Sequence, residues 1–86
     1  MLTPFMSKEV LYEPLKELYQ HYPNWLETNK NILSKDEYKK REQQCSVVKQ
    51  IIDEFDKNEH CSQERIVDLV QQMGHPPPDL AEFLSQ

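Results

Sequence analysis

Residues 34–56 read SKDEYKKREQQCSVVKQIIDEFD, and this stretch decides the fold class of the chain. Ser34 and Glu37 form a capping box, in which the Ser34 hydroxyl accepts from the Glu37 amide and the Glu37 side chain reaches back. We therefore expect the longest helix to run from about Lys35 to Asp56. Its apolar residues recur with helical periodicity and occupy one face: Tyr38, Cys45, Val48, Ile51, Ile52 and Phe55.

The residues before this helix predict helical segments that are separated by proline. A first helix should cover residues 4–13, because Thr3 is a good N-cap and the proline after it suits the first helical position. Pro14 lacks an amide hydrogen and should break or kink that helix. Pro23 should open another short helix, which carries Trp25 inward. We therefore expect a jointed, bent segment rather than one rod.

The residues after the long helix predict one more helix and a terminal turn. Ser62 is the N-cap of a helix over residues 63–73. Gly74 follows it, where a left-handed conformation is easiest for glycine. Residues 76–78 are prolines and should form a stiff, extended linker. The final stretch, DLAEFLSQ, should add a helical turn whose apolar side chains lie on the bundle: Leu80, Phe83 and Leu84.

The composition favours one small all-α domain. The chain has 86 residues with a single glycine and six prolines, and its β-branched residues never alternate as strands require. We expect residues 1–86 to form a single domain, a bundle of about four helical segments, with the first helix interrupted at Pro14. We also expect an amphipathic N-terminal helix beside a hydrophobic groove, and a chain that is a fragment of a longer protein.

The charge balance excludes several classes of partner. The net charge is −5, whereas nucleic acid and anionic membrane surfaces require a basic face. No apolar run approaches the length of a bilayer-spanning helix, so we expect no direct membrane insertion by this fragment. A partner that carries positive charge fits better.

The sequence contains no constellation that is typical of catalysis or metal binding. Glu9 and Glu13 lie one helical turn apart, but a bundle of this size seldom builds the enclosed pocket that catalysis needs. The cysteines and nearby histidines lack the spacing of zinc ligands, and with no secretory signal the thiols should be reduced. We expect neither enzymatic activity nor a cofactor nor a metal. The cysteines and histidines that lack this spacing are Cys45, His60, Cys61 and His75.

The beginning of the chain carries more apolar residues than the bundle needs. Successive helical residues lie about 100° apart, so Leu11 shares the side of Leu15 and Leu18. A second side is rotated away from these residues, and Val10 lies at its boundary. The candidate binding surface combines its apolar and acidic residues: Leu2, Phe5, Met6, Glu9, Val10 and Glu13.

Two other interpretations of this surface stay open at this point. Each large apolar side chain left in water forgoes roughly 1.5–3 kcal/mol, which favours a binding role. The segment could instead fold under the bundle. It could also pair with a second copy of itself, which would make the chain a homodimerisation or general protein-interaction module.

Three motifs resemble a known family. MSKEVLYEPLKEL at residues 6–18, YPNWLE at 22–27 and GHPPPDLA at 74–81 are similar, in order and spacing, to the C-terminal domain of the peroxin nineteen family. The resemblance implies a helical, cargo-binding bundle. Members of the family are cytosolic chaperones and import receptors for newly made peroxisomal membrane proteins, and they cycle to the peroxisomal membrane.

The resemblance also implies what is bound and where. The targeting signals of the cargo combine basic residues with apolar helical segments, and the family helix implicated in their recognition corresponds here to residues 3–12. Glutamates beside apolar residues suit such cargo. Members commonly end in a farnesylation box. This chain ends in EFLSQ, so the resemblance does not extend to that box.

Overall fold

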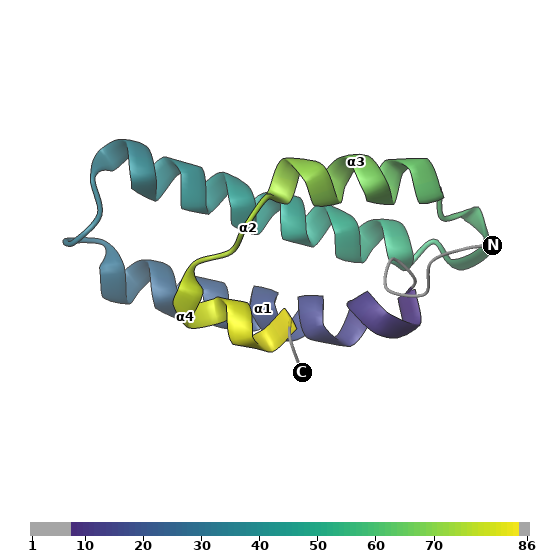
Figure 1. The fold of residues 1–86 in the computed structure, drawn as a ribbon, viewed down its shortest axis with the longest axis horizontal. Helices are drawn as coiled ribbons and strands as arrows, with labels where there is room; N and C mark the ends of the chain where they lie inside the picture. The colour runs from purple at the N-terminus through teal and green to yellow at the C-terminus, as the bar shows by residue number, and fades with distance from the viewer. Residues whose placement is uncertain (1–7, 85–86) are drawn as a thin grey trace.

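The computed structural model describes residues 8–84, which form four α-helices and two short 3₁₀-helices (Figure 1). The all-α class predicted from the sequence is confirmed over this range. In chain order the elements are α1 (Lys8–Asn29), α2 (Lys35–Phe55), η2 (Asn58–His60), α3 (Gln63–Met73), α4 (Pro78–Ala81) and η3 (Glu82–Leu84).

The two long helices form an antiparallel hairpin that the shorter elements cover on different sides. α3 packs along the second half of α2, and the chain then crosses back so that α4 and η3 lie on α1 (Figure 1). The body is elongated, with dimensions of 44 × 23 × 19 Å. None of the helices within residues 8–84 combines the length and the apolar character that crossing a bilayer requires.

The predicted break in the first helix is wrong, because α1 continues through both Pro14 and Pro23. A proline inside a helix removes one hydrogen bond and costs about 3 kcal/mol. The residues that face α2 offset this cost, since Leu15, Leu18 and Tyr22 are all buried on one continuous side of α1. Pro23 is exposed and Pro14 half-buried. Burial along the whole hairpin therefore outweighs the local preference to break.

α2 and α3 agree with the prediction. The Ser34 hydroxyl accepts from the Glu37 amide at 3.1 Å and α2 ends at Phe55, one residue before the expected end. Ser62 caps α3 in the same way, with its hydroxyl 3.2 Å from the amide nitrogen of Arg65. Gly74 ends α3 with a φ of +64°, a conformation that favours glycine. The capping residues thus determine where both helices begin.

The core draws side chains from every α-helix in the described range. On the α2 stripe that the sequence indicates, Val48, Ile51, Ile52 and Phe55 are buried, whereas Tyr38 and Cys45 are only half-buried. The buried apolar residues are Leu15, Leu18, Tyr22, Val48, Ile51, Ile52, Phe55, Ile66, Leu69, Met73 and Leu80.

A buried glutamine holds the crossing segment in place. The Gln44 side-chain amide donates to the carbonyl oxygens of Met73 and His75, at 2.7 and 2.6 Å. Its Oε1 accepts from the Tyr22 hydroxyl and, at 2.9 Å, from Arg41. Gln44 lies four residues before Val48 on the buried stripe, a position that the sequence analysis overlooked. One side chain thus connects α1, α2 and the start of the linker to α4.

A second buried polar group, Glu54, joins the end of α2 to the start of α3. Its carboxylate accepts from the Ser62 amide at 2.7 Å and from the Lys57 ammonium at 3.0 Å. These bonds favour the ionised form, first through the Ser62 amide and then through Lys57, and they hold the pKa of Glu54 below its ordinary value of 4.5. Glu54 therefore stabilises the turn only while it is charged.

We expect Glu54→Gln to lower the free energy of unfolding at pH 7 and to flatten its dependence on acid. The pKa is lower in the folded protein than in the unfolded chain. The stability that the carboxylate contributes is thus present above pH 4.5 and is lost as the pH falls through the folded value. Urea unfolding between pH 7 and pH 3 measures this, with the exposed Asp68→Asn as the control of equal charge change. Parallel pH profiles for wild type and Glu54→Gln would contradict the assignment.

Candidate protein-binding surface

Half of the candidate surface predicted from the sequence lies on the first two turns of α1. Glu9, Val10 and Glu13 belong to these turns. The other three residues, which are Leu2, Phe5 and Met6, lie outside the described residues. Their part in the surface stays a prediction.

One side of the first turns of α1 contacts the end of α2 and the residues that follow it. The Tyr12 hydroxyl donates to the Asp56 carboxylate at 2.5 Å, and the Tyr12 ring meets Phe55 edge to face at 6.4 Å between centroids. The hydrogen bond to that carboxylate raises the pKa of Tyr12. Lys8 donates to the side-chain oxygen of Asn58 at 2.9 Å. These contacts determine which side of α1 is left facing outward.

Glu9, Val10 and Glu13 form the outward side of these turns, and we call them the α1 strip. Val10 is 43% exposed and is one of two large hydrophobic residues within residues 8–84 that lie open to water. The Glu13 side chain is 76% exposed, and within residues 8–84 its one ion pair is a long contact of 3.5 Å with Lys16. Glu9 is also exposed. The α1 strip therefore presents one apolar group between two carboxylates that are free to meet cations.

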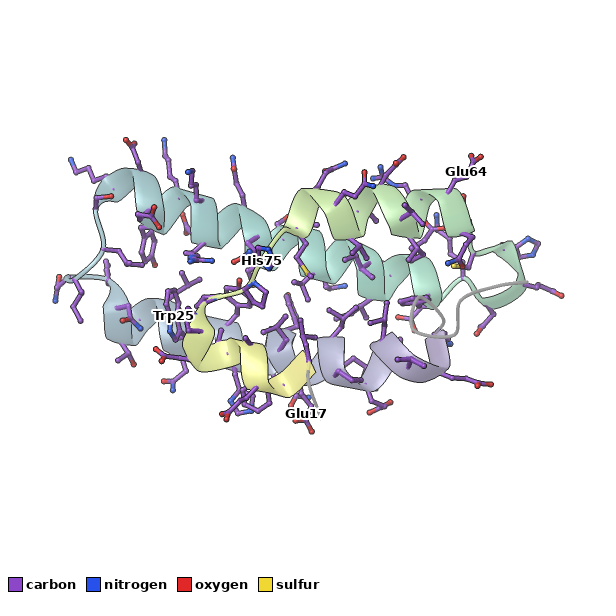
Figure 2. All side chains as sticks on the ribbon, viewed as in Figure 1. Glu17, Trp25, Glu64 and His75 are labelled. Atoms are coloured by element: carbon purple, nitrogen blue, oxygen red, sulfur yellow. The ribbon has the colours of Figure 1, made fainter. Side chains whose placement is uncertain are left out.

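Farther along α1, the adjoining flank is already covered by a short helix of the chain itself. The Phe83 ring of η3 stacks on His21 at 4.4 Å, and the indole of Trp25 donates to Asp79 of α4 at 3.1 Å. Figure 2 shows Trp25 beside the start of α4 and Glu17 pointing outward near the end of η3. Leu80 is buried beneath this segment. The flank of α1 thus accepts a short amphipathic helix with an acidic residue, and this helix stops before the α1 strip.

Two well-formed clefts lie along α2, and neither is lined by Val10. One of about 730 Å³ lies between α2 and the end of α3, and one of about 330 Å³ lies at the tip of the hairpin. The hydrophobic groove expected beside the N-terminal helix is formed by neither cleft. α2 packs against the inner face of α1, where Leu15, Leu18 and Tyr22 are buried. A groove formed together with residues 1–7 stays a prediction, because these residues lie outside the described range.

The described part of the chain holds no cluster of three or more metal-ligating side chains. Cys45 and Cys61 are free, half-buried thiols. Burial raises the pKa of both, and Glu54 adds to this effect at Cys61. A raised pKa keeps a thiol in its protonated, weakly nucleophilic form.

Comparison with known proteins gives consistent matches across the chain. The Pex19 protein family matches residues 1–85. Peroxisome biogenesis protein 19-2 of Arabidopsis thaliana is 32% identical over 85 residues, which cover 95% of this chain and 34% of that protein. Peroxisomal biogenesis factor 19 of Homo sapiens is 34% identical over 92 residues, with coverage of 94% and 31%. This chain therefore spans about a third of the length of these relatives, and no solved structure matches it.

Proposed function

Because this chain belongs to the Pex19 protein family, we propose that its helical domain binds the targeting segments of newly made peroxisomal membrane proteins. The resemblance of the three sequence motifs is thereby confirmed at the level of the family, and the family implies a role in peroxisome biogenesis. The proposed identity of the bound segments, and of the residues that bind them, rests on the chemistry of the α1 strip.

The exposure of Val10 between two carboxylates carries this proposal. A targeting segment that combines basic residues with an apolar helical face would bury Val10 and place its cations beside Glu9 and Glu13. Contact between a helix and an apolar strip is a common mode of peptide recognition. Each exposed ion pair adds only about 0–1 kcal/mol, so the carboxylates select and orient the cargo more than they tighten it.

The apolar residues at the beginning of the chain complete the proposed surface. The proposed surface includes Leu2, Phe5 and Met6, which lie outside the described residues. Methionine adapts to many shapes, which suits a receptor for many sequences. Shielding an apolar segment in this way is the work of a chaperone and import receptor. We place it in the cytoplasm, cycling to the peroxisomal membrane, with no insertion of this chain into the bilayer.

The direct test is charge reversal on the α1 strip. We expect Glu9→Lys with Glu13→Lys to weaken binding of a synthetic, lysine-rich amphipathic peptide by about tenfold, because two attractive contacts become repulsive. High salt should shrink this difference. Titration by fluorescence anisotropy at low and high salt measures both effects.

The control variant is Glu64→Lys with Asp68→Lys, which makes the same charge change on exposed residues of α3 (Figure 2). An equal loss in the control, or a salt response that the α1 variant leaves unchanged, would refute recognition by the α1 strip.

Phe5→Ala with Met6→Ala should weaken binding of the same peptide without lowering the melting temperature. A sharp fall in melting temperature would instead identify these residues as core.

The alternative of self-association through the N-terminal helix makes a different prediction. A two-fold contact pairs the same patch on both copies, so it would bring the carboxylates of two α1 strips together. Repulsion between them disfavours such a dimer. Sedimentation measures the oligomeric state. A chain that sediments as a monomer and binds the basic peptide supports the receptor function, whereas a chain that sediments as a dimer and does not respond to the peptide supports the alternative.

A further inference from the structure

The loop between α1 and α2 and the first turns of α2 carry charge of the opposite sign to the rest of the molecule. We call residues 30–42 the hairpin tip. Five of the ten basic residues of the chain fall within residues 30–42, together with three acidic residues, so the hairpin tip has a net charge of +2 while the whole chain has −5. The basic residues are Lys30, Lys35, Lys39, Lys40 and Arg41.

The hairpin tip also exposes apolar surface beside these charges. Ile32 is 76% exposed, the most exposed large hydrophobic residue within residues 8–84. The residue that follows it, the half-buried Leu33, lines the cleft of about 330 Å³ together with the half-buried Tyr38. Because burial of a large aliphatic side chain is favourable, this surface is suited to a partner that covers it.

The lysines around this cleft are available to a partner. Lys30, Lys35 and Lys39 line the cleft. The ion pairs found in residues 8–84 involve Lys16, Lys49 and Lys57, and none involves a lysine of the hairpin tip. Glu42 is the one acidic residue in the cleft wall. The cleft therefore combines an apolar wall with an excess of unpaired cations at its rim.

We propose that the hairpin tip binds an acidic segment of a partner protein, which places one large apolar side chain in the cleft and its carboxylates beside Lys30, Lys35 and Lys39. A protein segment fits better than an anionic membrane, because a flat bilayer surface supplies no protruding side chain to fill the cleft. The net charge of −5 for the whole chain also opposes approach to an anionic bilayer.

This second site is independent of the proposed cargo surface. Figure 1 shows the α1–α2 loop at the opposite end of the long axis from the start of α1. The two sites also differ in charge, since the α1 strip presents carboxylates and the hairpin tip presents ammonium groups. An acidic partner could therefore be held while basic cargo occupies the other end.

The test uses three short synthetic peptides that share a central Leu-Phe pair and are flanked on both sides by glutamate, serine or lysine. In amide NMR titrations of the whole chain, we expect the glutamate peptide to shift resonances of residues 30–42, and high salt to weaken its binding. The serine and lysine peptides should bind at least about tenfold more weakly. Equal binding of the serine peptide, or shifts elsewhere on the chain, would overturn the proposal.

Charge-reversal variants separate this site from the rest of the molecule. Lys35→Glu with Lys39→Glu should weaken the glutamate peptide by at least about tenfold, while Lys16→Glu with Lys49→Glu, an equal change on exposed lysines outside the tip, should not. Circular dichroism confirms that each variant is folded, and Glu9→Lys with Glu13→Lys should leave this binding intact even if cargo binding fails. If the tip resonances respond to phosphatidylserine vesicles and to none of the peptides, the hairpin tip contacts membrane instead and the proposal is wrong.

Discussion

Leu18→Ala is expected to lower the free energy of unfolding by about 3 kcal/mol, within the range of about 2–5 kcal/mol for leucine truncation in a core. Leu18 is completely buried on the inner face of α1, where its side chain belongs to the cluster shared with α2 and α3. A domain of this size is typically stable by roughly 4–13 kcal/mol, so the variant should lose a large fraction of that stability. Urea unfolding followed by helical circular dichroism measures it.

The matched control for Leu18 is Ile32→Ala, which removes an aliphatic side chain that is 76% exposed. We expect its stability to stay within about 0.5 kcal/mol of wild type. If Leu18→Ala cost no more than this control, the inner face of α1 would not pack against α2. A continuous helix through Pro14 and Pro23 would then lack the burial that stabilises it.

The second large effect is expected for Gln44→Leu, which should lower the free energy of unfolding by about 3 kcal/mol, since each buried polar group left unpaired costs roughly 1–3 kcal/mol. The variant removes both hydrogen bonds to the carbonyl oxygens of Met73 and His75. It also leaves the buried Tyr22 hydroxyl without its acceptor. Leucine is uncharged, like glutamine, but carries neither a donor nor an acceptor, so none of the hydrogen bonds of Gln44 can be replaced.

A fluorescence signal distinguishes this mechanism from general destabilisation. Trp25 is the single tryptophan of the chain. Its indole donates a hydrogen bond to Asp79 at the start of α4, and its ring centroid lies 5.9 Å from the Arg41 guanidinium carbon. Release of the linker should shift its emission to longer wavelength under folding conditions. The adjacent, exposed Gln43→Leu should change neither emission nor stability. Unchanged emission in folded Gln44→Leu would show that other contacts hold α4.

Local signals made much of the fold predictable. The capping residues Ser34 and Ser62 lie directly before periodic apolar runs, and both helices begin where these residues place them. Gly74 predicts the end of α3. The prolines after it predict an extended linker over residues 76–78, which is correct for Pro76 and Pro77 but wrong for Pro78, because Pro78 is the first residue of α4. The final apolar residues lie in the helical turns expected there. Such features depend on neighbouring residues alone, which is why the sequence suffices for them.

Features that depend on distant segments could not be predicted in the same way. The cost of Pro14 is visible in the sequence, whereas the burial that offsets it requires α2 to lie alongside. Gln44 is polar and drew no attention among its apolar neighbours, because its partners are carbonyl oxygens about 30 residues away. Its position on the buried stripe was the available signal.

The candidate site was predictable in composition and less so in shape. Helical geometry placed Glu9 and Glu13 beside Val10 on one side of α1, and all three are exposed as expected. The expected groove beside the N-terminal helix stays a prediction, because residues 1–7 lie outside the described range and neither of the two clefts along α2 is lined by Val10. The hairpin tip was missed since the net charge of the chain conceals the opposite sign of residues 30–42.

The acceptors of the Gln44 amide are both main-chain oxygens, which every amino acid possesses. These two hydrogen bonds therefore do not depend on which side chains residues 73 and 75 carry. Replacing the exposed side chain of His75 would leave both hydrogen bonds in place, whereas replacing Gln44 would remove them.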